Sequence, residues 1–167
     1  MNTDEISLRP YPVNSPQAAA RIVALALIAN GRIKAVETAA LDALDAPGML
    51  GLTRPQWHDV IRDLCADLLE ATRFDNECCI SADLLDRVLS EVDDAVQRRV
   101  VLRLGSAVIQ ADRQIDDGES FVLLAAVERW GFHPDDQALL EPVLYGSDFL
   151  VRPRGGPLDG GHRLRLR

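Results

Sequence analysis

Apolar side chains recur along this chain at three- and four-residue spacing, the period of one face of an α-helix. One such row is formed by Trp57, Ile61, Leu64 and Leu68. Rows of this kind predict helices over residues 16–29, 35–44, 53–72, 81–89, 92–111 and 121–130, with a last short helix ending near residue 144. No segment has a convincing core-strand pattern, so we predict an all-α bundle of about seven helices.

Side chains that cap helices stand where several of these rows begin. They are Ser15 followed by Pro16, Thr53 paired with Gln56, and Ser81. Gly131 is a typical helix stop. On the helix over 92–111, we expect one buried face made of Val96, Val100, Leu104, Val108 and Ala111.

A shift of 82 residues aligns two helix–turn–helix stretches of the chain. The aligned pairs are Ala29 with Ala111, Asn30 with Asp112, Ile33 with Ile115, Glu37 with Glu119, and Leu41 with Leu123. We therefore predict an internal duplication that relates residues 16–70 to residues 93–145 within one helical domain over 16–145. Residues 1–15 then form an irregular lead-in and residues 146–167 a basic tail. Ile33 and Ile115 are expected to be buried between the helices that meet at each turn.

The second turn, "ADRQIDDGES", places four acids within eight positions. Helix-start electrostatics accounts for some of this charge. Four neighbouring carboxylates nevertheless repel one another unless a hard cation or a basic surface neutralises them. We predict that Asp112, Asp116 and Glu119 converge on a divalent cation, and that Asp117 is a surface charge available to dock a partner.

The first turn offers a second choice of ligands, Asn30 and Glu37. The second turn is not an EF-hand, because Gly118 comes one position late for that template and Leu123 stands where its glutamate belongs. Helix capping alone, and docking of a partner without metal, remain alternative interpretations of both turns.

The two turns, "IANGRIKAVE" and "IQADRQIDDGE", resemble the turns of the tellurite-resistance TerB-like family. The resemblance spans about residues 16–145. It implies an all-helical fold built from two related halves, as in the N-terminal domain of a membrane-anchored DnaJ-type co-chaperone. The first copy departs from the family pattern with Asn30 in place of aspartate, and the second with Arg113 in place of glycine.

Charge is unevenly distributed along the 167 residues. Residues 1–151 carry 13 basic and 25 acidic side chains, whereas residues 152–167 carry five arginines and one acid. An acidic body repels nucleic-acid phosphates, so we expect a protein partner, free or membrane-associated, and no nucleic acid. The tail alternates apolar residues with arginine, which predicts a β-hairpin or arm that docks through Arg163, Arg165 and Arg167.

The most apolar run, residues 18–29, is too short for a membrane span, and no leader pattern opens the sequence. We expect a cytoplasmic protein, or one peripheral to the inner membrane. Cys65, Cys78 and Cys79 match no zinc or redox spacing and are expected to be reduced thiols.

No familiar catalytic motif is present, and helix starts account for the paired acids. We therefore predict a non-enzymatic stress-response or resistance accessory protein whose acidic turns bind a divalent cation, dock a partner, or do both. The alternatives are a metal-dependent, hydrolase-like enzyme that uses the acidic cluster, and a structural module that acts through the arginine-rich tail.

Overall fold

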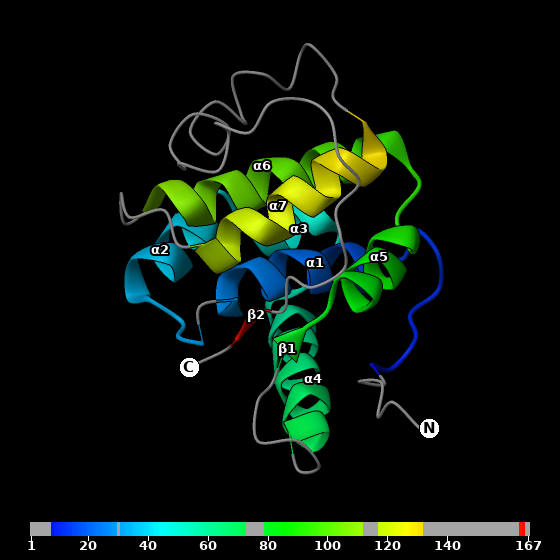
Figure 1. Ribbon diagram of the computed structural model, residues 1–167. Coiled ribbons are helices and arrows are strands. Elements are labelled where there is room, and N and C mark those ends of the chain that lie inside the picture. The colour runs from blue at the N-terminus through cyan, green and yellow to red at the C-terminus, as the bar shows by residue number, and fades with distance from the viewer. Residues whose placement is uncertain (1–7, 30, 73–78, 112–116, 132–163, 166–167) are drawn as a thin grey trace, which may run out of the picture.

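The computed structural model describes residues 8–29, 31–72, 79–111, 117–131 and 164–165, and over these residues the fold is all-α, as predicted (Figure 1). The described helices are α1 (Pro16–Ile28), α2 (Ala35–Ala43), α3 (Ala46–Leu50), α4 (Arg54–Thr72), α5 (Ala82–Ser90), α6 (Ala95–Ala111) and α7 (Asp117–Trp130). Two two-residue strands, β1 (Cys79–Ile80) and β2 (Leu164–Arg165), complete the described elements.

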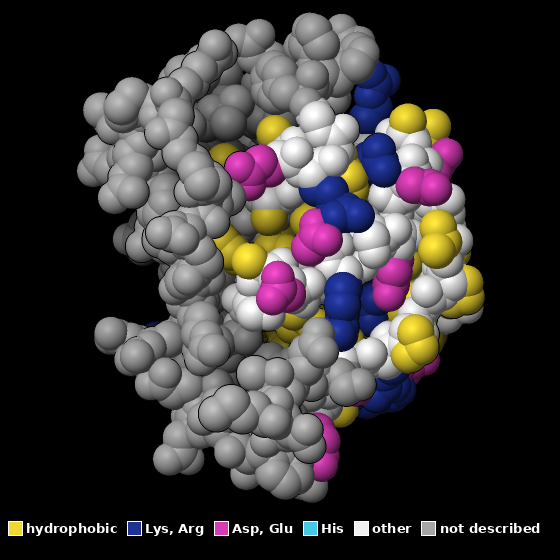
Figure 2. Space-filling model, turned by 45° about the vertical axis from the view of Figure 1, so that its right-hand side comes forward, with side chains coloured by type: hydrophobic (Ala, Val, Ile, Leu, Met, Phe, Trp, Pro, Cys, Tyr) yellow, Lys and Arg dark blue, Asp and Glu magenta, His cyan; other side chains and the backbone are white. Residues whose placement is uncertain are grey.

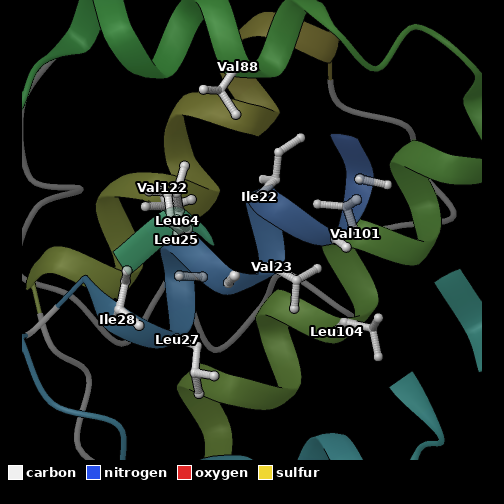
Figure 3. Close-up of a cluster of buried hydrophobic side chains, with 14 of the residues drawn as sticks. Ile22, Val23, Leu25, Leu27, Ile28, Leu64, Val88, Val101, Leu104 and Val122 are labelled. Carbon is white, nitrogen blue, oxygen red and sulfur yellow. The ribbon is translucent and has the colours of Figure 1, made fainter. Parts of the chain in front are cut away.

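Helix α1 lies at the centre of the bundle and packs against α4, α6 and α7. Every residue from Ala18 to Ala29 is buried, because other helices surround α1 and its alanines let them approach closely. Figure 3 shows where the helices meet: Ile22 and Leu25 of α1 lie among Leu64 of α4, Val88 of α5 and Val122 of α7, together with Val101 and Leu104 of α6.

The predicted capping residues act as expected. The Ser15 hydroxyl accepts a hydrogen bond from the amide of Ala18 at 3.1 Å, and Ser81 does the same for Leu84. Thr53 and Gln56 form a reciprocal capping box, in which the Thr53 amide donates to the Gln56 side chain at 2.9 Å. Gly131 ends α7 with φ at +82°, a backbone conformation that suits glycine.

Two predicted burials are wrong. Ile33 is 50% exposed, because the segment before α2 runs outside the helix interface and the inward-facing residues of α2 are Glu37 and Leu41. Val96 is 70% exposed, because α6 begins at Ala95 rather than Val92 and the buried residues of α6 start at Val101. Ile115 lies outside the described residues.

The sequence interpretation also missed α3. No helix was predicted between residues 44 and 53, yet Ala46–Leu50 form a short helix of their own with a proline in the first turn. Proline is tolerated there because the first turn has no intrahelical partner for its missing N–H.

The described part of the basic tail pairs with a segment far from it in sequence. Strand β2 runs antiparallel to β1, with Cys79 opposite Arg165 and Ile80 opposite Leu164. The other arm of the predicted hairpin, over residues 148–154, lies outside the described residues. The tail strand is thus tied to the chain just before α5.

The two predicted halves share the order of their first two helices. Glu37 is the third residue of α2, and Glu119 is the third residue of α7. Helix α2 packs against α6, and α7 packs against α1. If a twofold relation maps α1 onto α6 and α2 onto α7, these two contacts are equivalent, as the duplication requires. The third helix of the second half falls in residues 132–145, outside the described part of the chain, so the duplication stays a prediction.

Candidate functional site

Most of the predicted ligands and docking residues have no described side chain. Asp112, Asp116, Asn30, Arg163 and Arg167 lie outside the described residues, and the backbones of Asp117, Glu119 and Arg165 are described without their side chains. Glu37 is the predicted ligand whose surroundings can be given. Across the described segments, no three His, Cys, Asp or Glu side chains lie close enough together to hold a metal ion.

Glu37 lies in the first turn of α2 and is fully buried, with 0% of its surface exposed. The N-terminal end of a helix favours a negative charge, which agrees with its predicted place at a helix start. Burial is the unexpected feature, because a carboxylate that leaves water needs partners for both of its oxygens. Helix α2 packs against α6, beside the end of α6 from which the chain passes into residues 112–116 (Figure 1).

The counter-ion of Glu37 is Lys34, whose Nζ lies 3.1 Å from Oε1. This contact is an ion pair by distance, but neither Glu37 oxygen accepts a hydrogen bond of normal geometry from the described residues. The ion pair still stabilises the carboxylate, because an ammonium group attracts a carboxylate from any direction. Lys34 is 29% exposed and so reaches water while Glu37 does not.

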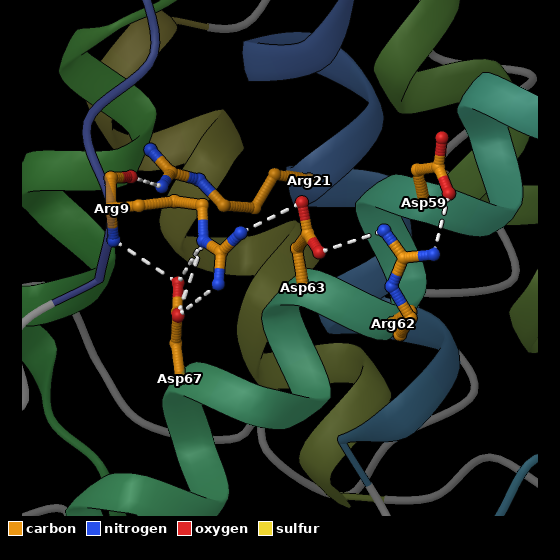
Figure 4. A network of polar contacts seen from close by, with 6 residues as sticks. All are labelled: Arg9, Arg21, Asp59, Arg62, Asp63 and Asp67. Atoms are coloured by element: carbon orange, nitrogen blue, oxygen red, sulfur yellow. Dashed lines mark hydrogen bonds and ion pairs between the residues drawn. The ribbon is translucent and has the colours of Figure 1, made fainter.

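A second polar cluster lies on the other side of the molecule, where residues 8–14, the N-terminal strap, cross the helices. Arg9 of the strap forms hydrogen bonds to Asp67 of α4 at 2.8, 3.0 and 3.2 Å, and an ion pair with Asp63 at 2.8 Å (Figure 4). The Arg9 amide also donates to Asp67, at 3.1 Å. Partial burial by itself raises the pKa of Asp67, but the hydrogen bonds from Arg9 outweigh it and hold that pKa below its ordinary value.

Arg21 of α1 is the buried member of this cluster, at 2% exposure. Its guanidinium forms an ion pair with Glu91, donates to the Arg9 carbonyl and lies 4.8 Å from the centre of the Tyr11 ring. The pKa of Tyr11 is raised, chiefly because the ring is partly buried. Arg21 thus joins the strap to the end of α5.

The strap is also fixed at its far end. The Asn14 side chain accepts from the amides of Asp93 and Asp94, at 2.9 and 3.0 Å, just before α6. The Gln97 side chain donates to the Asn14 carbonyl at 2.7 Å. Residues 8–14 therefore connect α4 to the start of α6 across α1.

Sequence reasoning missed this cluster, although two signals pointed to it. Asp59, Asp63 and Asp67 follow one another at four-residue spacing on a helix, which places them in one row. Arg21 is the single charged residue in the apolar run of α1.

On the face seen in Figure 2, acidic and basic side chains lie beside one another rather than in patches of one sign.

Other candidate groups are less distinctive. His58 is exposed on α4, and Cys65 is a free thiol, half-buried on the same helix, whose burial raises its pKa. A thiol with a raised pKa is a poor nucleophile at neutral pH. No described helix is long and apolar enough to cross a membrane.

Comparison with models of known protein families, with curated proteins and with solved structures found no match to this chain. The resemblance to the TerB-like family therefore stays an expectation from the two turns.

Proposed function

We propose that this protein is a non-enzymatic accessory protein that binds a divalent cation at its first interhelix turn, with Glu37 as the carboxylate ligand. The stress-response or resistance role is what the family resemblance implies. The observation that carries the proposal is the complete burial of Glu37 with both oxygens short of hydrogen bonds.

The chemistry of such a site follows from the carboxylate. Hard divalent cations bind oxygen ligands, and a buried carboxylate that lacks hydrogen bonds is a strong one because water does not compete for it. Lys34 supplies positive charge to Glu37, and its partial exposure gives the ammonium group a path into water when another cation arrives. Asn30 of the same turn is the other predicted ligand.

The test is calorimetric titration of the full chain with magnesium, calcium and manganese chlorides. Replacing Glu37 with Gln keeps the shape and removes the charge, so we expect at least about tenfold weaker cation binding. Replacing Lys34 with Met removes the competing ammonium group, so we expect tighter binding. The matched control is Asp42→Asn on the same helix, since Asp42 is half exposed and pairs with Arg54 at 3.3 Å.

The two substitutions act in opposite directions, which separates a ligand role from general destabilisation. Equal affinities for the wild type and the Glu37→Gln variant would contradict the assignment of Glu37 as a ligand. Absence of saturable binding by the wild type with all three cations would contradict the cation-binding function itself. Circular dichroism of each variant shows that the helices are retained.

A further inference from the structure

The N-terminal strap is bound to the helices in the way that a short peptide is bound to a receptor. Residues 8–12 have no regular secondary structure, and Pro10 and Pro12 lack the N–H groups that backbone pairing would use. The contacts are made by side chains at defined points instead. Leu8 at one end of the strap is buried in the core cluster.

The first recognition point is an arginine clamp. Asp67 binds both the guanidinium and the backbone amide of Arg9, and Asp63 binds the same guanidinium from one turn earlier on α4. Paired contacts of this kind fit the planar fork of arginine and do not fit the single ammonium group of lysine. The clamp therefore selects arginine rather than positive charge in general.

The second recognition point is Arg21, which lies beneath the strap. It binds the carbonyl of the clamped residue and the aromatic ring two positions later. Its guanidinium is buried, and its Nε–H has no hydrogen-bond partner among the described residues. Arg21 thus binds the backbone and the aromatic side chain of whichever segment lies over it.

We propose that this surface is a binding site for an extended peptide segment with an arginine two residues before an aromatic ring, that the strap occupies it within the chain, and that a partner protein presenting such a segment displaces the strap. Apart from the backbone hydrogen bond from the Asn14 amide to the Glu91 carbonyl at 2.7 Å, each polar contact of the strap with the helices uses a side chain of the strap or of the helices, so a segment on another chain can reproduce them. Asn14, with φ at +60°, forms the turn between the strap and α1, and its hydrogen bonds to Asp93, Asp94 and Gln97 anchor that turn. Residues 8–12 can therefore leave while Asn14 and α1 stay in place. The inference is independent of the cation site, because Glu37 belongs to another cluster.

The experiment uses the full chain and a fluorescein-labelled peptide with the sequence of residues 6–15, ISLRPYPVNS. Replacing Arg9 of the protein with Ala loosens the strap within the chain and opens the clamp. Occupation by the strap lowers the apparent affinity of the wild type by the fraction of open molecules. We therefore expect fluorescence anisotropy to show binding to the Arg9→Ala variant at least about tenfold tighter than to the wild type.

An Arg9→Lys variant keeps the charge but loses the paired contacts, and it should fall between the wild type and Arg9→Ala. It also provides a second measurement if Arg9→Ala folds poorly. Adding Asp67→Asn should abolish peptide binding, whereas Asp59→Asn, the same change on the same helix without an Arg9 contact, should leave it unchanged. A peptide with Ala in place of its arginine should not bind.

Three results would overturn the proposal. The first is no saturable peptide binding by either Arg9 variant, and the second is binding that Asp67→Asn leaves intact. The third is a wild-type dimer in light scattering that the Asp67→Asn substitution dissociates, because the occupant would then be the strap of a second copy.

Discussion

The ion pair between Arg21 and Glu91 joins a buried group to a partly exposed one, and this asymmetry makes a sharp prediction. Arg21 is 2% exposed, whereas the Glu91 side chain is 20% exposed. Replacing Glu91 with Gln leaves a guanidinium buried without a counter-ion. Replacing Arg21 with Met leaves a carboxylate that water can still reach.

Removing one partner of a buried ion pair costs about 3–5 kcal/mol, because the other charge stays buried and unpaired. Since water has some access to position 91, we place Glu91→Gln at the lower end, about 3 kcal/mol. With a urea m-value of about 2 kcal/mol/M, the unfolding midpoint falls by roughly 1.5 M. Arg21→Met should cost about 1.5 kcal/mol, the lower end of the range for a hydrogen bond made by a charged group, because it loses its bond to the Arg9 carbonyl.

The assay is urea unfolding at pH 7, followed by circular dichroism, for the wild type, both single variants and the double variant. Adding Glu91→Gln to Arg21→Met should cost almost nothing, because the buried charge is already gone. Glu128→Gln, an exposed glutamate on α7, is the control and should shift the free energy of unfolding by less than about 0.5 kcal/mol. If Arg21→Met destabilises the protein more than Glu91→Gln, or if the two effects add, the buried-charge reasoning is wrong.

Two further predictions concern α4 and α6. Because the pKa of Asp67 is depressed in the folded state, its contact with Arg9 stabilises the protein above the unfolded-state pKa of about 3.9 and is lost as the pH falls through the lower folded-state value. The difference in urea midpoint between the wild type and Asp67→Asn should therefore be constant from pH 5 to pH 7 and disappear in strong acid, and a difference that persists there would refute the linkage. In α6, a Cβ added at Gly105 would lie 2.4 Å from Cδ1 of the buried Leu123. Overpacking of about 1–3 kcal/mol should exceed the roughly 1 kcal/mol by which Ala favours a helix. Gly105→Ala should thus lower the melting temperature in the wild type and raise it in a Leu123→Ala background, and the reverse order would contradict the close packing of α6 and α7.

The features that the sequence predicted well depend on contacts between near neighbours in the chain. The Ser15, Thr53 and Ser81 caps each act within three residues, so the residue types alone identify them. The all-α class followed in the same way from the helical spacing of apolar residues. The wrong burial of Ile33 shows the limit, because that prediction depended on how two helices meet rather than on either helix.

The pairing of residues at the strap site could not be predicted, because its contacts join distant parts of the sequence. Arg21 binds Arg9 and Glu91, at separations of 12 and 70 residues, and Arg9 binds Asp67 at a separation of 58. In the sequence, Arg21 interrupts an apolar run and nothing marks its partner. For Glu37, the sequence predicted the position at the start of a helix correctly but did not predict the burial of the side chain.

The core is made largely of alanine and leucine, and the polar contacts of Arg21 fix how the central helix α1 is rotated about its axis within it. Helix α1 is apolar around its whole circumference, so hydrophobic packing by itself permits several rotations of the helix about its axis. Arg21 is its one charged residue, and a buried guanidinium tolerates only the rotation that brings it to Glu91 and the strap. The same contact that orients α1 therefore also places Arg21 beneath Arg9 and Tyr11. The strap can bind where it does because the central helix has only one orientation in which its charge is satisfied.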